Sequence, residues 1–129
     1  MENSFVLLFP ETFYSKLTVN TLHFIHTNVE NPLRVGFVAE QLNVSAEHLI
    51  RVFKKDTGLT PRKYINKVKM EQAKSLLKES NLSVGKISTS LGYKNRDHFC
   101  RLFHSMVEQS PRKYKSAHRL AEKQKTQCV

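Results

Sequence analysis

The chain contains an internal repeat with a period of about fifty residues, and this feature restricts its fold more than any other. Seven positions of the first copy recur 49 or 50 residues later, as the pairs Val38 and Ile87, Leu42 and Leu91, Leu49 and Phe99, Arg51 and Arg101, Phe53 and Phe103, Pro61 and Pro111, and Tyr64 and Tyr114. One additional residue in the second copy, within the turn 92–95, accounts for the change from 49 to 50. Repetition at a fixed period indicates that one supersecondary unit occurs twice.

The repeated unit is helical. Apolar residues recur at spacings of three, four and seven, glycine is scarce, and no long alternating stretch indicates a strand. Helix starts are marked by the N-cap residues Ser45, Ser83 and Asn95, and by the pairs Thr60-Pro61 and Ser110-Pro111. Gly58 and Gly92 are expected to end helices. These signals predict seven helices, over residues 12–30, 36–44, 45–58, 60–79, 83–91, 95–107 and from 110 onwards.

Each copy reads as a short helix, a tight turn and a second, capped helix, which is the helix-turn-helix pattern. Two such copies predict an all-α, homeodomain-like fold, in which a central linker helix joins two helix-turn-helix subdomains. We expect an N-terminal extension or linker over residues 1–14, a first subdomain over 15–59, the linker helix over 60–79, a second subdomain over 80–119 and a polar tail over 120–129.

The chain is strongly basic, with 21 Lys and Arg against 11 Asp and Glu and a formal net charge of +10. This imbalance favours a nucleic acid or another anionic surface as the partner. Two cysteines make no disulfide framework, which is typical of a reducing compartment. The apolar run from Phe5 to Phe9 is too short for a signal-peptide core or a membrane span. We therefore expect a cytoplasmic protein with no membrane partner.

Over roughly residues 16–119 the chain resembles the DNA-binding domain of the AraC/XylS transcription regulators. The resemblance is carried by ISTSLGYKNRDHFCRLFHSMVEQSPRKY in the second copy, and by LIRVFKKDTGLTPRKYI and MEQAKSLL before it. It implies two helix-turn-helix units bridged by a central helix. It also implies that the two reading helices enter successive major grooves on one face of the DNA, which lie about 34 Å apart.

The chain departs from the family pattern at two positions. The family usually has Arg four residues before the alanine of the linker helix, whereas this chain has Lys69 before Ala73. Lysine keeps the charge but lacks the planar fork of arginine. After the second reading helix, Glu108 stands where the family usually places Gly, as Gly58 does in the first copy. We expect this helix end to be either capped differently or strained, and neither departure lies on the reading surface.

Each reading helix is expected to keep one stripe of side chains for the core and to present the other to DNA. The core stripes are Leu49, Val52 and Phe53 in the first helix, and Phe99, Leu102 and Phe103 in the second. The resemblance implies that the base contacts come from Glu47, Ile50, Arg51, Arg96, Asp97, Cys100 and Arg101. Their chemistry fits this role, because arginine can bond guanine O6 and N7, carboxylates accept from cytosine N4, and isoleucine can pack on a thymine methyl.

Phosphate contacts are expected from basic side chains and from helix starts, where unpaired N–H groups and the helix dipole favour an anion. We predict this role for Lys54, Lys55 and Lys94, for Arg62, Lys63, Arg112 and Lys113 at the two Pro-Arg-Lys starts, and for Ala46, His98 and His104 at the edges of the reading faces. Contacts of this kind position a protein on DNA without specifying a sequence.

Other roles for the same residues are weaker. Cys100 and His104 lie four residues apart, a spacing that suits a metal, but a structural zinc site needs four ligands. As a nucleophile pair they lack an orienting third group. Tyr64 and Tyr114 are expected in the core rather than as base-stacking platforms. Arg51 could be a solvated surface charge, but Arg101 occupies the equivalent position of the second copy, which favours DNA contact for both. We therefore expect no metal, no cofactor and no enzymatic activity.

These observations favour a sequence-specific, DNA-binding transcription regulator, most simply a bacterial activator, with double-stranded DNA and RNA polymerase as partners. The competing class is a helical interaction module that binds RNA polymerase or another regulator and uses its charge only weakly. The chain reads either as a stand-alone regulator or as the C-terminal part of a longer one. In the second case, a separate domain would sense an effector and could form an oligomer.

Overall fold

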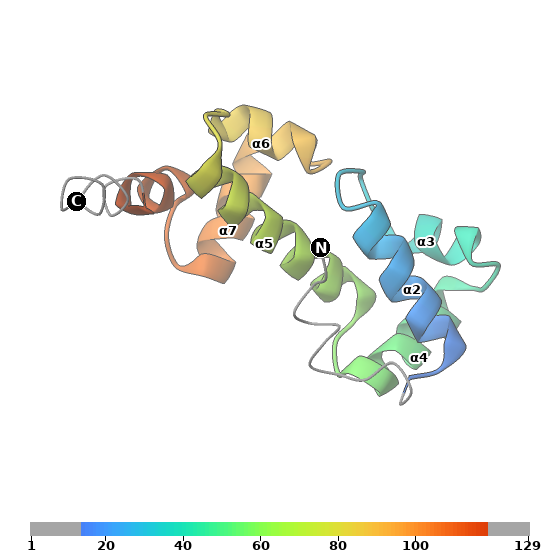
Figure 1. The fold of residues 1–129 in the computed structure, drawn as a ribbon. Helices are drawn as coiled ribbons and strands as arrows, with labels where there is room; N and C mark the ends of the chain where they lie inside the picture. Colours follow the sequence, from blue (N-terminus) through green and yellow to red (C-terminus); the bar gives the residue numbers. More distant parts are fainter. Residues whose placement is uncertain (1–13, 119–129) are drawn as a thin grey trace. The chain divides into compact units, whose positions relative to one another are not determined.

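The computed structural model describes residues 14–118, and every regular element within them is an α-helix (Figure 1). The helices are α2 Lys16–Thr27, α3 Val35–Gln41, α4 Ala46–Thr57, α5 Pro61–Glu79, α6 Val84–Ser90 and α7 Arg96–Val107. A seventh helix begins at residue 111 and continues to residue 118, the last one described. The predicted all-α fold is confirmed.

The first predicted helix is shorter than residues 12–30. In α2 the Ser15 hydroxyl accepts a hydrogen bond from the Thr18 backbone N–H, so that Ser15 is the N-cap and the helix begins at Lys16. At the other end, the Asn28 N–H bonds the Ile25 carbonyl, which tightens the last turn and ends the helix at Thr27. Residues 12 and 13 lie outside the described residues.

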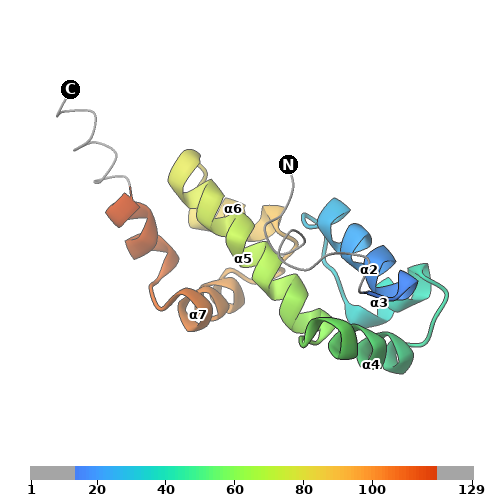
Figure 2. The same ribbon diagram turned by 60° about the horizontal axis from the view of Figure 1, so that its bottom comes forward.

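The chain divides into two compact units, and the boundary falls within α5. Among the described residues, the first unit contains residues 14–29 together with Leu33–Val68. The second unit contains Glu30–Pro32 and residues 69–118. Figure 2 shows α5 as one uninterrupted helix, so a single element contributes to both units. The finer division into residues 15–59, 60–79 and 80–119 stays a prediction.

In the first unit the reading helix α4 is held by two buried clusters. One of them comes from α2, α4 and the first half of α5, namely Leu22, Ile25, Phe53, Tyr64, Ile65 and Val68. The other comes from α3 and α4, namely Val38, Ala39 and Leu49. The ring of Phe53 meets that of Tyr64 edge to face, with 5.6 Å between centroids. Leu49 and Phe53 therefore fix the roll of α4 about its axis.

The end of α4 is also tied to the start of α2. The Asp56 carboxylate accepts hydrogen bonds from the Ser15 N–H and hydroxyl, both at 2.9 Å, and from the Thr18 hydroxyl at 2.6 Å. The bond from Thr18, the largest contribution, lowers the pKa of Asp56. A carboxylate that accepts three hydrogen bonds is held in its charged form, so it connects the two helices.

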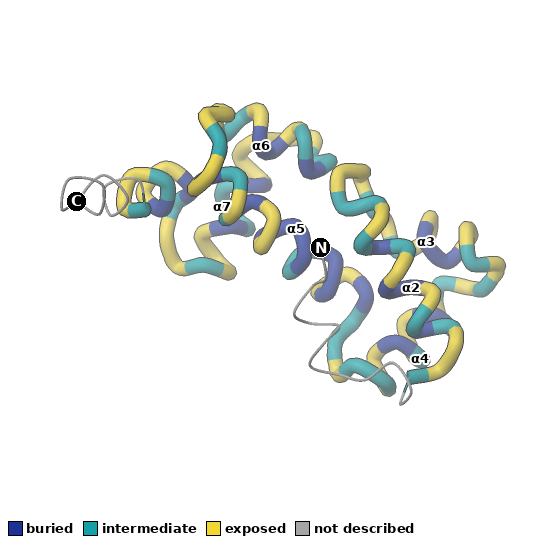
Figure 3. The backbone as a smooth tube through the Cα atoms, viewed as in Figure 1, coloured by how far each residue is buried: buried dark blue, intermediate teal, exposed yellow. Residues whose placement is uncertain are grey.

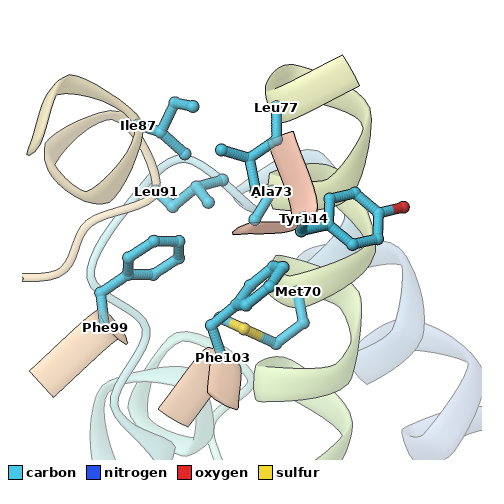
Figure 4. Packing of buried hydrophobic residues seen from close by; sticks show 8 residues of the cluster. All are labelled: Met70, Ala73, Leu77, Ile87, Leu91, Phe99, Phe103 and Tyr114. Carbon is cyan, nitrogen blue, oxygen red and sulfur yellow. The ribbon is translucent and has the colours of Figure 1, made fainter. Parts of the chain in front are cut away.

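The second unit has one continuous core around α7. Figure 4 shows its members, which come from α5, α6, α7 and the final helix: Met70, Ala73, Leu77, Ile87, Leu91, Phe99, Phe103 and Tyr114. Phe103 and Tyr114 meet edge to face at 5.7 Å, as do their equivalents in the first unit. The prediction that Tyr64 and Tyr114 belong to the core is therefore confirmed.

The repeat extends to the backbone conformation of the turns. The turn before each reading helix has one residue with positive φ, Asn43 at 58° and Gly92 at 82°. The next residue donates back into the preceding helix at the same place, from Val44 N to Ala39 O at 3.0 Å and from Tyr93 N to Ser88 O at 3.1 Å. The two turns thus have the same backbone conformation and hydrogen bond, although their side chains differ.

The end of α7 is capped in the same way as the end of α4. Gly58 has a φ of 81° and its N–H bonds the Lys54 carbonyl, while Glu108 has a φ of 66° and its N–H bonds the His104 carbonyl. We expected this helix end to be either capped differently or strained. The structure shows the strained alternative, because the same left-handed cap is kept by Glu108, a residue with a Cβ. A left-handed conformation costs such a residue roughly 1–2 kcal/mol.

Candidate nucleic-acid interface

Both reading helices bury one side and expose the other. Leu49 and Phe53 in α4, and Phe99 and Phe103 in α7, are fully buried. Figure 3 shows that buried and exposed positions alternate along α4 and α7, as expected for helices anchored along one stripe. Ser45 caps α4 and Asn95 caps α7 as predicted, since each side chain accepts from a backbone N–H in the first turn. Ser45 and Asn95 are themselves exposed, so the capped starts of both helices are solvent-accessible.

In α4 the predicted base-reading residues Glu47, Ile50 and Arg51 are all exposed. Ile50 is 39% exposed and is one of four large apolar residues on the surface of residues 14–118. Ala46 is half-buried and packs against the cluster around Leu49. The face therefore combines one carboxylate, one apolar side chain and one guanidinium, with the exposed Lys54 and Lys55 in the last turn as predicted phosphate contacts.

In α7 the predicted base-reading residues Arg96, Asp97 and Arg101 are exposed, whereas Cys100 is half-buried and packs against the core of the second unit. Cys100 therefore offers only part of its side chain to a ligand. The predicted phosphate contacts Lys94, His98 and His104 are all exposed. Within each unit, the residues assigned to base reading thus lie on one helix and, apart from Cys100, are exposed.

The two Pro-Arg-Lys starts have the same local structure. Pro61 and Pro111 are buried, while the four basic residues Arg62, Lys63, Arg112 and Lys113 are exposed. The N–H of Lys63 bonds the Thr60 hydroxyl at 3.3 Å, and that of Lys113 bonds the Ser110 hydroxyl at 3.2 Å. Because proline has no N–H, the backbone donors left at these starts among residues 14–118 are those of Arg62 and Arg112.

Lys69 has a structural role that its sequence position did not predict. Its side chain is 3% exposed, and its ammonium donates to the carbonyls of Asn31, at 2.7 Å, and of Leu91. Leu91 is the C-cap of α6, so Lys69 satisfies a backbone carbonyl in the turn that precedes α7. Burial lowers the pKa of Lys69 to about 8. The ammonium also lies 5.6 Å from the centre of the Tyr93 ring.

A pH dependence of stability follows from this burial. The pKa of Lys69 is about 8 in the folded chain against 10.5 for an unburied lysine, so the unfolded chain binds more protons between these values. The contribution of Lys69 to the free energy of unfolding should therefore rise by on the order of 1–3 kcal/mol as pH increases from 8 to 10.5. Burial raises the pKa of Tyr64 and Tyr93, which opposes this rise near pH 10, so the contribution of Lys69 is measured against a variant. In urea titrations at both pH values, the change in stability should be more favourable by this amount in the wild type and in the exposed Lys78→Arg than in Lys69→Arg. Equal changes in all three proteins would contradict the assignment.

His48 is the other residue that sequence reasoning missed. Its Nδ1 lies 3.0 Å from Nη2 of Arg51, one helical turn further along α4. The repeat gives a signal for it, because His48 and His98 occupy equivalent positions and only His98 was singled out.

No group of three or more His, Cys, Asp or Glu side chains that could hold a metal ion is present among the described residues. Within residues 14–118, no helix combines the length and apolar character needed to cross a bilayer.

Comparison with known proteins relates the chain to transcription regulators. A family model described as a helix-turn-helix domain matches residues 38–117. The chain is similar to the HTH-type transcriptional activator RhaS of Shigella boydii, with 40% identity over 75 residues, which are 58% of this chain and 27% of RhaS. The chain spans about a third or less of the length of several such relatives.

Solved structures share the fold. The C-terminal domain of AraT, a response regulator from Geobacillus stearothermophilus, matches with a TM-score of 0.78 and 28% identity, over 80% of this chain and 86% of that one. The DNA-binding domain of AdpA, a global transcriptional factor solved in complex with a target DNA, matches with a TM-score of 0.79 over 85% of this chain and 99% of that one. At 22% identity, the likeness to AdpA concerns the fold alone.

Proposed function

Because the chain belongs to the AraC/XylS family of helix-turn-helix transcription regulators, we propose that it binds double-stranded DNA sequence-specifically and regulates transcription. In this proposal α4 and α7 are the two recognition helices, and they enter successive major grooves of one site. The AdpA domain of the same fold was solved on a target DNA, which supports this assignment.

One observation carries the proposal. Each unit anchors its reading helix with two fully buried side chains, and each presents an exposed arginine, Arg51 or Arg101, at the equivalent position. The same two helices carry an acidic residue at the equivalent place in the first turn, Glu47 or Asp97. A general solvated surface does not require such matched pairs. Two DNA-reading units of the same design do require them, and we call these units the first head, which contains α4, and the second head, which contains α7.

The exposed faces of α4 and α7 would each contact bases in one half of the site. In the first head, Arg51 would bond guanine, Glu47 would accept from cytosine N4, and Ile50 would pack on a thymine methyl. In the second head, Arg96, Asp97 and Arg101 would take the polar contacts. The half-buried Cys100 would then be a small contact beside a base rather than a reactive thiol.

Phosphate contacts would hold both heads in register. Around the first head we assign them to the residues near α4 and the start of α5, namely Ala46, Lys54, Lys55, Arg62 and Lys63. Around the second head we assign them to Lys94, His98, His104, Arg112 and Lys113. The N–H groups of Arg62 and Arg112, which have no partner within residues 14–118, add a backbone donor to each set.

We propose a cytoplasmic regulator that acts as an activator, as the related RhaS is named, with RNA polymerase as its protein partner. The chain spans a third or less of the length of these relatives, and effector sensing or oligomerisation by a separate domain stays a prediction. Catalysis has no part in this function.

Binding to DNA should be strongly dependent on salt. Fluorescence anisotropy on a pool of random duplexes should give an affinity that falls by on the order of 10³-fold between 50 and 200 mM salt, because each phosphate contact releases counterions. Lys55→Ala should weaken binding to all sequences alike and reduce the slope of log affinity against log salt by about one. The exposed Lys78→Ala, outside the proposed interface, should leave the slope unchanged. Absent or salt-insensitive binding would favour the interaction module instead.

A further inference from the structure

We propose that His48 is a positioning residue that orients Arg51 for base reading, so that the first head discriminates more strongly at its arginine position than the second head does at Arg101. This inference rests on the proposed function, because it assigns a specificity-determining contact within the reading face of α4. It is carried by the geometry of the pair and by the difference between the two heads.

The geometry of the pair fixes which atom donates. His48 lies in the first turn of α4, where its backbone N–H bonds the Ser45 hydroxyl at 3.1 Å. A guanidinium can only donate, so the 3.0 Å contact runs from Nη2 of Arg51 to an acceptor nitrogen, Nδ1 of His48. This bond uses the tautomer of His48 that carries its proton on Nε2. One of the five N–H donors of Arg51 is used, and the remaining four include the two that a guanine needs.

The equivalent histidine of the second head is engaged elsewhere. The ring of His98 meets the ring of Tyr93 edge to face, with 5.9 Å between centroids. Val44 occupies the place of Tyr93 in the first copy, as the matching backbone hydrogen bonds of the two turns show. Since valine offers no ring, His48 has no such stacking partner there and bonds Arg51 instead. Arg101 has no hydrogen-bond or ion-pair partner among residues 14–118.

A guanidinium held in place before binding loses fewer rotamers when it bonds a base. Immobilising a rotamer-rich side chain reduces affinity by roughly 2- to 10-fold, and this loss is avoided where the side chain is already held. A guanidinium that is already held in one orientation is also less able to adapt to a wrong base. Discrimination at the base pair read by Arg51 should therefore exceed that at the base pair read by Arg101.

The test uses a panel of single base-pair substitutions in one bound site. The base pair read by Arg51 is identified as the one whose substitution no longer changes affinity in Arg51→Ala. The base pair read by Arg101 is identified in the same way with Arg101→Ala. His48→Ala should reduce discrimination at the Arg51 base pair by roughly 2- to 10-fold and leave that at the Arg101 base pair unchanged. His48→Asn should restore most of the loss, because its Oδ1 stands where Nδ1 stood.

Two controls separate positioning from a structural role. His98→Ala, the matched change in the second head, removes a proposed phosphate contact, so it should lower affinity alike over the whole panel and leave the discrimination ratios at both arginine base pairs unchanged. The double variant of His48→Ala with Arg51→Ala should discriminate no less than Arg51→Ala alone. Unfolding midpoints of all variants should agree with that of the wild type, since both histidines are exposed.

Three results would overturn the inference, and none of them is the failure of DNA binding itself. The first is unchanged discrimination at the Arg51 base pair in His48→Ala. The second is a uniform loss of affinity over the whole panel, which would make His48 a phosphate contact. The third is that Arg51→Ala removes discrimination nowhere. If the wild type does not discriminate between sequences at all, the proposed function fails, and this outcome is distinct from the other three.

Discussion

Gly92→Ala is expected to destabilise the second unit by roughly 3 kcal/mol or more, a large effect for a single methyl group. Gly92 has a φ of 82°, a conformation that side chains with a Cβ rarely adopt. In addition, a Cβ at this position would lie 2.5 Å from the backbone carbon of Asn31 and 2.5 Å from the nitrogen of Pro32. All three residues belong to the second unit, and backbone atoms cannot move aside as a flexible side chain can.

Gly58→Ala is the matched control for this experiment. Gly58 has nearly the same φ, 81°, but a Cβ there would meet no atom within 4 Å. Alanine at this position should therefore lose only the stability that the left-handed conformation costs, roughly 1–2 kcal/mol. Urea unfolding followed by circular dichroism measures both variants. Equal losses of stability would contradict the close approach of Asn31 and Pro32 to Gly92.

Arg51→Ala and Arg101→Ala should each remove sequence discrimination at a different base pair. A good bidentate arginine–guanine contact contributes roughly 1–3 kcal/mol of discrimination, which corresponds to about 5- to 150-fold in relative affinity. The two losses should fall in different halves of the site, because the arginines occupy equivalent positions of two separate heads. Competition titrations over a panel of single base-pair substitutions measure the ratios directly.

The comparison with a phosphate contact makes this prediction specific. Lys55→Ala should lower the affinity for every member of the panel by a similar factor, because a phosphate carries no sequence information. If both arginine variants instead behaved like Lys55→Ala, the assignment of the reading faces on α4 and α7 would be wrong.

The repeat and the cap residues were sufficient to predict most of the fold. Helix starts at Ser45, Ser83 and Asn95 depend on interactions within a few residues, so their signals are visible in the sequence. The same holds for the burial of Tyr64 and Tyr114, whose matched positions required matched environments. The exposure of the reading faces followed from the helical period once the core stripes had been assigned.

The features that were not predicted depend on contacts between distant residues. Lys69 bonds carbonyls that lie 38 and 22 residues away, and no local pattern identifies which backbone groups a buried lysine will meet. Gly92 was recognised as a helix stop, but its approach to Asn31 is a tertiary contact. The bond between His48 and Arg51 is local, but the equivalent His98 meets the ring of Tyr93, whose place in the first copy is taken by Val44.

Selection of bound sequences from a pool of random duplexes tests the two-headed, sequence-specific function most directly. We expect enrichment of a site with two conserved blocks about one helical turn apart, roughly 10 base pairs, one for each head. In pools selected with Arg51→Ala or Arg101→Ala, conservation should be lost in one block and kept in the other. A pool that shows no enrichment, or a site in which both variants erode the same block, would contradict the function proposed for this chain.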